Sequence, residues 1–257
     1  MDKKLLNLIE KTLETTTPLV EVGALYDTKF INVLLGIYRV SFSTLRDIYY
    51  LSQNEETGAS ALDLNRKLIE YGITVEYIIW KGKEKMAEKF QKYMHVEVHH
   101  EIEFLKSIGQ DLKNQSEELK IGVEETEHEY NALNSDTKNR KNWAGLSIEK
   151  MIEDLHNAQQ LEYFESSRIG QAYIWGCRLN HVSPFVVHKY LGPKESEIAS
   201  DYYMRQAIMF GILFHLRLTT RYIDEIRILN NSNVYPELAS EVALIYNELE
   251  NYSPEEK

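Results

Sequence analysis

Apolar residues recur at helical spacing along almost the whole chain, and no segment shows the strict alternation of a strand. The spacing predicts helices over residues 3–15, 20–52, 58–81, 84–108, 114–135, 147–156, 160–181, 184–191, 196–229 and 236–250. Turn-forming residues separate these segments, and residues 133–142 are predicted to form a flexible joint. The pattern therefore predicts an all-α fold: a single domain over residues 1–257, built as a multi-helix bundle with a peripheral polar helical hairpin at residues 110–142.

The predicted helix at 58–81 is apolar on two opposite faces. One face carries Leu62, Ile69, Ile73, Tyr77 and Trp80, and the other carries Leu64, Leu68, Val75 and Ile79. Such a helix is expected at the centre of a bundle. Arg66 projects among the apolar residues, with Glu70 one turn later and Glu76 at the opposite edge, so we expect these charges to have partners. Arg66 and Glu70 have two interpretations: an ordinary i,i+4 ion pair, or groups facing an internal polar pocket.

Composition agrees with a folded helical protein and excludes some classes of partner. Hydrophobic residues make up 43% and charged residues 27% of the chain, while 12 Gly and 5 Pro are too few for the turns of an all-β fold. The net charge of −11 disfavours non-specific binding to nucleic acids and to anionic membranes, because both attract basic surfaces.

Cysteine usage and hydropathy predict a cytoplasmic protein. Cys177 is the only cysteine, which excludes an intrachain disulfide and a cysteine-based zinc site. The N-terminal residues lack the apolar core of a signal peptide, and the apolar stretch 207–216 is too short to span a bilayer. We therefore predict that this stretch is a buried core helix and that the protein has no membrane partner.

The stretch RLNHVSPF combines a helix boundary with candidate chemistry. Ser183 before Pro184 predicts the end of one helix and the cap of the next. Arg178 and His181 share a face at the carboxyl end of the first helix, where the helix dipole favours positive charge. The same two side chains could instead bind a phosphate, or act as electrostatic stabiliser and general acid/base.

Two Glu-x-x-His pairs, Glu97/His100 and Glu125/His128, match part of the di-iron carboxylate arrangement. That arrangement also needs an inward glutamate from each of two further helices, and the helix at 58–81 supplies only one convincingly. The HExxH motif, Gly-rich phosphate loops and the GxSxG elbow are absent from the sequence. We therefore predict no metal and no cofactor, with a di-iron protein as an alternative.

Three motifs lie in the blocks 66–106, 142–155 and 163–185: an Arg-x-x-x-Glu helix, Trp-x-Gly-x-Ser, and a helix ending in a histidine before a serine corner. With them the chain resembles, over roughly residues 30 to 220, an uncharacterised bacterial family filed as domain of unknown function five-six-seven-seven. The resemblance implies an all-helical fold and no known reaction. It points to Arg66, Glu70, Trp143, Gly145, Ser147, His181 and Ser183. It also implies that Arg66, Glu70 and His181 converge in space.

We predict a helical protein whose internal polar pocket binds an unknown protein partner or a small anionic ligand. The resemblance suggests that the protein acts in stress response or phage defence. The candidate catalytic residues are His181, Arg178, Arg66 and Glu70, and the candidate ligand-binding residues are Trp143, Ser147 and Ser183. The rival is a metal-independent ribonuclease similar to the HEPN family, with His181 as general acid/base and Arg178 or Arg66 stabilising phosphate charge. The chain departs from that family's longer Arg–His spacing, because two residues separate Arg178 from His181. The oligomeric state is left open.

Overall fold

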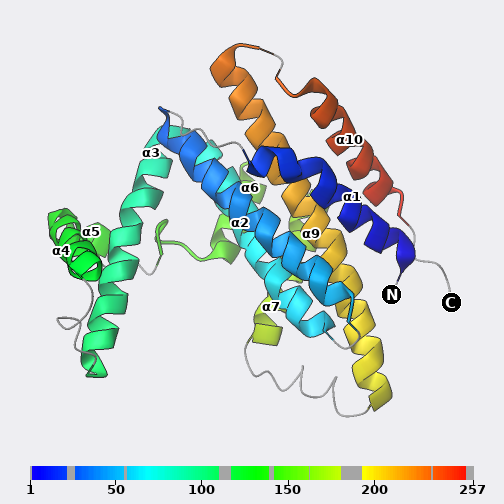
Figure 1. The fold of residues 1–257 in the computed structure, drawn as a ribbon, viewed down its shortest axis with the longest axis horizontal. Coiled ribbons are helices and arrows are strands. Elements are labelled where there is room, and N and C mark those ends of the chain that lie inside the picture. The colour runs from blue at the N-terminus through cyan, green and yellow to red at the C-terminus, as the bar shows by residue number, and fades with distance from the viewer. Residues whose placement is uncertain are drawn as a thin grey trace.

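The computed structural model describes residues 2–21, 27–54, 57–109, 117–138, 142–161, 163–180, 193–232 and 234–252. These residues contain no strand and form the helices α1 (Lys3–Val20), α2 (Lys29–Ser52), α3 (Gly58–Ser107), α4 (Glu117–Ala132), α5 (Ser135–Lys138), α6 (Ile148–Asn157), α7 (Tyr163–Asn180), α9 (Pro193–Asn230) and α10 (Pro236–Glu250) (Figure 1). The predicted all-α class is confirmed. Within the described ranges, no helix is long and apolar enough to cross a membrane.

The structure corrects the predicted boundary between the first two helices. α1 continues to Val20, where the sequence predicted an end at residue 15, and α2 begins at Lys29 instead of residue 20. Threonine hydroxyls donate to carbonyl oxygens one turn earlier along α1: Thr12 to Leu8 (2.7 Å), Thr16 to Thr12 (2.8 Å) and Thr17 to Leu13 (2.8 Å). The threonines thus satisfy their hydroxyls within the helix. Pro18 comes in the last turn, where its missing N–H removes only one backbone hydrogen bond.

Residues 58–81 of α3 form the centre of the bundle, as their two apolar faces predicted. Leu68 lies on the face that meets α2 and α9, where it approaches Gly211. The other face meets α7 and α6, and the backbone of Leu62 lies against Gly176 of α7. The two apolar faces are therefore covered by different pairs of helices, and few of their side chains reach solvent.

A buried carboxylate ties α3 to α9. Glu76 is 4% exposed, and its carboxylate accepts hydrogen bonds from Arg217 Nε (2.9 Å) and from Nε and Nη2 of Arg221 (2.9 Å each). The two guanidinium groups hold the pKa of Glu76 below its ordinary value, although burial acts in the opposite direction. Because an unpaired buried charge is costly, this cluster fixes how far α3 and α9 can slide along each other.

A buried histidine joins α1, α2 and α9. His215 lies in the apolar stretch that the sequence assigned to a core helix, and it is fully buried. Its Nδ1 lies 2.9 Å from Ser41 Oγ, its Nε2 lies 3.0 Å from Thr16 Oγ1, and its ring stacks on Tyr38. Burial lowers the pKa of His215 to about 3, so the imidazole is neutral at physiological pH.

Acidification from pH 7 to pH 5 is expected to destabilise the fold through His215. Its pKa is about 3 in the folded chain and 6.5 when unperturbed, so below pH 6.5 the unfolded chain takes up a proton that the folded chain does not. The cost is about 1.4 kcal/mol per pH unit, or about 2 kcal/mol at pH 5, and it is absent above pH 7. Urea unfolding at both pH values should show a smaller loss for His215→Gln than for the wild type. Equal losses would contradict this role.

α3 bends at Gly82, between the two helices that the sequence predicted over 58–81 and 84–108. Gly82 has φ 111° and ψ 100°, a conformation that residues with a side chain avoid. The distal part of α3 therefore leaves the bundle, carrying α4 and α5 with it (Figure 1). We call residues 83–109, α4 and α5 the arm.

Polar contacts hold the bend in place. Lys83 Nζ lies 2.6 Å from Glu225 of α9. The carboxylate of Glu84 accepts hydrogen bonds from the backbone N–H groups of Lys29 (3.0 Å) and Phe30 (3.3 Å), at the beginning of α2. An anionic group is favourable at this end of a helix. The direction of the arm is thus fixed by contacts to two bundle helices.

Gly82→Ala is expected to lower the free energy of unfolding by about 1–3 kcal/mol, because alanine is strained at the positive φ of this residue. Gly36→Ala is the matched control: Gly36 is an exposed residue inside α2 with open space where a Cβ would lie. There alanine should stabilise the helix by about 0.5–1 kcal/mol. Urea unfolding measures both changes, and a neutral or stabilising Gly82→Ala would contradict a required bend.

Candidate functional site

Helices α3 and α7 bring a group of polar side chains together. Arg66 and Glu70 lie one turn apart on α3, and Tyr173 and Cys177 lie one turn apart on α7. Gly176 permits the close approach, since a Cβ at this residue would lie 2.7 Å from the Cβ of Arg66. We call Arg66, Glu70, Tyr173 and Cys177 the α3–α7 cluster.

Within the cluster, Arg66 and Glu70 form an i,i+4 ion pair, which was one of the two interpretations of their spacing. Arg66 Nε lies 3.2 Å from Glu70 Oε1, and the two side chains are 19% and 30% exposed. Burial raises the pKa of Glu70, while the charge of Arg66 and a hydrogen bond with Tyr173 act in the opposite direction. Burial also raises the pKa of Tyr173, and its hydrogen bond with Cys177 adds to this, so the phenol stays protonated.

The charges of the cluster do not favour an anionic ligand at Arg66. Glu70 already neutralises the guanidinium, and the carboxylates of Asp63 and Glu149 act on Glu70 as further negative charges. An anion placed at Arg66 would meet these carboxylates. Within the described residues, Arg66 and Glu70 form a partly buried ion pair on α3, and the hydrogen bond of Glu70 with Tyr173 joins α3 to α7.

Of the other predicted catalytic residues, only Arg178 lies in the described part of the chain. Arg178 is exposed, and its guanidinium lies over the ring of Trp175 at 5.8 Å. It follows Gly176 by two residues, which places it about 200° round α7 from the side that contacts Arg66. His181 and Ser183 lie outside the described residues, so their convergence with Arg66 and Glu70 stays a prediction.

The Trp-x-Gly-x-Ser motif forms a turn that packs beside the bend of α3. Trp143 is 8% exposed and makes edge-to-face contacts with Tyr77 (6.3 Å between ring centroids) and Phe90 (5.3 Å). Gly145 has φ +75°, and Ser147 caps α6 by accepting a hydrogen bond from the backbone of the third helical residue. In the described contacts, Trp143 therefore packs against aromatic residues and Ser147 caps a helix.

Sequence reasoning missed Asn142, which organises this turn. Its Oδ1 accepts hydrogen bonds from the backbone N–H groups of Ala144 (3.1 Å), Gly145 (2.7 Å) and Leu146 (3.2 Å). An asparagine at the start of a Gly-containing turn commonly bonds to the backbone ahead of it, so the order Asn-x-x-Gly was the available signal. The residue is structural and holds the tryptophan in position.

The two Glu-x-x-His pairs do not assemble into a metal site in the described part of the chain. Glu97, His100, Glu125 and His128 are all exposed. Among the residues whose positions are described, no group of three or more His, Cys, Asp or Glu side chains is placed to hold a metal ion. The described residues therefore supply no set of metal ligands for the di-iron alternative.

The arm has one face covered by α4. The ring of His99 stacks on Tyr130 with centroids 3.6 Å apart, and Lys106 Nζ lies 3.0 Å from the carboxylates of both Glu103 and Glu127. Ile102, on the same part of α3, is 4% exposed. These contacts attach α4 to the distal part of α3.

A second face of the arm is exposed and carries large apolar side chains. Met94 is 55%, Phe104 62% and Ile108 61% exposed. Glu97 and Glu101, also exposed, lie between them at successive spacings of three and four residues. These five residues form one stripe along the helix, which we call the arm stripe.

Gly176→Ala is expected to destabilise the protein by about 1–3 kcal/mol, because the new Cβ would force Arg66 and α7 apart. Gly170→Ala on the same helix is the control, since open space surrounds the place where its Cβ would lie. That change should be neutral or stabilising by up to about 1 kcal/mol. Thermal and urea unfolding of the two variants would measure the difference. Equal stability would argue against close packing of α7 on α3.

Comparison with known proteins identifies a family and no activity. A family model described as "Family of unknown function (DUF5677)" matches residues 31–198, a range that includes most of α2 and all of α3, the arm and α7. No curated protein and no solved structure matches the chain.

Proposed function

The chain belongs to this family of unknown function, and we propose that it is an interaction protein whose arm stripe binds an amphipathic helix of a partner protein. The observation that carries the proposal is the arm stripe itself: Met94, Phe104 and Ile108 expose most of their apolar surface along one helix face. Large apolar side chains gathered in exposed positions on one face of a folded protein commonly mark a binding site.

The spacing of the arm stripe fits a second helix. Its five residues span 94–108, about 21 Å of helix at 1.5 Å per residue. The five positions share one face of the helix, with Phe104 and Ile108 one turn apart and Met94 beyond the two glutamates, and partner helices dock on such faces. Helix-to-helix docking therefore matches the stripe better than an extended peptide, which would repeat every two residues.

The charge of the arm stripe defines the partner further. Glu97 and Glu101 lie between the apolar side chains, so a partner helix with Lys or Arg beside its apolar residues would be complementary. A second copy of this chain would bring the same glutamates together, and its net charge of −11 would add repulsion. We therefore propose a basic amphipathic helix of another protein, and we place this interaction in the cytoplasm on account of the single cysteine.

The fixed bend supports this role because it holds the arm away from the bundle before any partner binds. A preorganised surface loses less conformational entropy on binding than a flexible one. For the predicted anionic ligand at Arg66, the neighbouring carboxylates are unfavourable. The ribonuclease alternative depends on His181, which lies outside the described residues.

The test is the binding of a synthetic helical peptide with leucines on one face and lysines beside them, followed by fluorescence anisotropy. The wild-type protein should bind it, and Phe104→Ser should weaken binding by at least about tenfold, because a large apolar contact is lost. Leu244→Ser is the matched control: Leu244 is 57% exposed on α10, outside the arm.

A twin peptide with glutamates in place of the lysines tests the charge. It should bind the wild type weakly and should bind better to Glu101→Lys. Circular dichroism of each variant establishes that the helical fold is retained. The proposal is overturned if Phe104→Ser and Leu244→Ser behave alike, or if the two peptides bind the wild type equally.

A further inference from the structure

The methionines of the described residues differ in how far solvent reaches them. Met94, in the arm stripe, is 55% exposed, whereas Met86, Met151 and Met204 are buried and Met209 is half-buried against the core. Oxidants convert the thioether of methionine into a sulfoxide, and an exposed sulfur is reached more easily than a packed one. A mild oxidant is therefore expected to oxidise Met94 before the other methionines of the described ranges.

Met94 forms one end of the arm stripe. About 15 Å of helix separates it from Phe104, at 1.5 Å per residue, and the positions between them on this face are glutamates. Phe104 and Ile108 lie at the other end, one turn apart, so they cannot replace the apolar contact of Met94. A partner helix that docks along the whole stripe would bury the Met94 thioether.

We propose that Met94 is a reversible oxidation site and that its sulfoxide weakens binding of the partner helix, an inference that rests on the function proposed above. The oxidant is hydrogen peroxide. A lone pair of the Met94 sulfur attacks one peroxide oxygen, so that the S–O bond forms and the O–O bond breaks. The proton of the transferred hydroxyl passes to the leaving oxygen. The sulfur loses an electron pair, and the peroxide is reduced to water.

The sulfoxide changes the chemistry of this end of the arm stripe. Its oxygen is a polar acceptor that water solvates, so burying it against an apolar side chain of the partner costs free energy that the thioether does not cost. Because Met94 is exposed, the added oxygen displaces no core side chain. A bound partner would in turn cover the sulfur and slow its oxidation.

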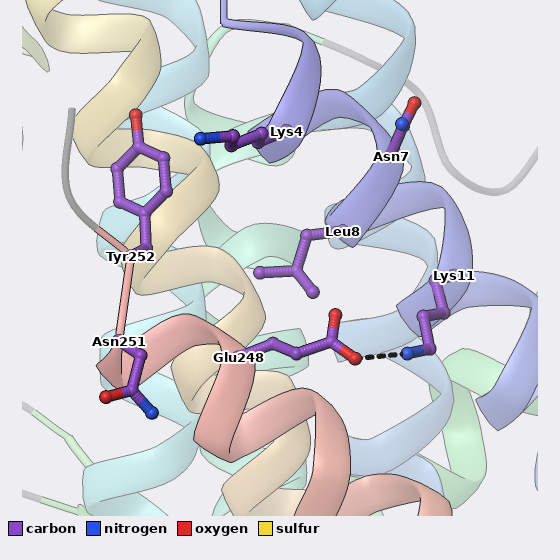
Figure 2. A pocket seen from close by; sticks show the side chains of 7 residues that line it. All are labelled: Lys4, Asn7, Leu8, Lys11, Glu248, Asn251 and Tyr252. Carbon is purple, nitrogen blue, oxygen red and sulfur yellow. Dashed lines mark hydrogen bonds and ion pairs between the residues drawn. The ribbon is translucent and has the colours of Figure 1, made fainter. Parts of the chain in front are cut away.

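A cleft elsewhere on the molecule offers a mild oxidant no target. It has a volume of about 460 Å³ and lies between α1 and the end of α10, with Leu8, Lys11 and Glu248 in its lining (Figure 2). None of the described side chains that line it contains sulfur. A loss of peptide binding after peroxide treatment would therefore be assigned to the arm and not to this cleft.

The experiment treats the full-length protein with hydrogen peroxide, measures the oxidation of each methionine by peptide mass spectrometry, and repeats the anisotropy titration with the leucine–lysine peptide. Sulfoxide should form first at Met94, and the peptide should then bind at least about fivefold more weakly. The methionine sulfoxide reductases, one for each sulfoxide epimer, should restore binding. Saturating peptide added before the peroxide should slow the oxidation of Met94.

Two leucine variants make the assignment specific, and each is compared with itself before and after peroxide. Met94→Leu cannot form a sulfoxide at this position, so its own affinity should not change. Met209→Leu removes a sulfur from α9 and should lose affinity on oxidation as the wild type does. Both changes nearly conserve side-chain volume, and circular dichroism checks the fold. Both variants keep Cys177, so oxidation of that thiol cannot explain a difference between them.

The inference is wrong if Met94 is not oxidised ahead of the other methionines, if its sulfoxide leaves the affinity unchanged, or if the two leucine variants respond alike. In each of these cases the untreated wild type still binds the peptide, and the proposed function stands. An untreated wild type that does not bind the peptide overturns both proposals.

Discussion

Residues 58–81 of α3 have to bury two opposite apolar faces at once, and the arrangement of the bundle depends on this constraint. One face is covered by α2 and α9 and the other by α7 and α6, so four helices take their positions from a single central one. Glycines at 176 and 211 let the neighbouring helices approach closely enough to exclude water. The hydrophobic effect thus selects the layers, and the glycines set the distances between them.

Polar groups inside this bundle fix the register between neighbouring helices, which apolar packing alone leaves free. Apolar surfaces can slide by a turn at small cost, whereas Glu76 has to meet Arg217 and Arg221, and His215 has to meet hydroxyl groups on α1 and α2. A displaced helix would leave a buried charge or ring nitrogen without a partner. These contacts therefore specify one register among several that would bury similar apolar area.

The arm extends on one side of this bundle, away from α1 and α10 (Figure 1). The arm stripe does not use the α3–α7 cluster, in which Arg66 and Glu70 pair on α3 and Glu70 has a hydrogen bond with Tyr173 of α7. In the proposed interaction function, the exposed face of the arm supplies the binding surface and the described polar groups of the core serve packing.

The sequence by itself determined the local features: the helical class, the central position of residues 58–81, the break near Gly82, the ion pair of Arg66 with Glu70 and the cap by Ser147. Each depends on residues within a turn or two of one another, and helical periodicity reports such neighbours directly. Only the tertiary structure decided that Arg178 is exposed beside Trp175 and that Met94, Phe104 and Ile108 stay exposed. An apolar stripe looks the same in sequence whether another helix covers it or not, because burial depends on contacts between segments that are distant along the chain.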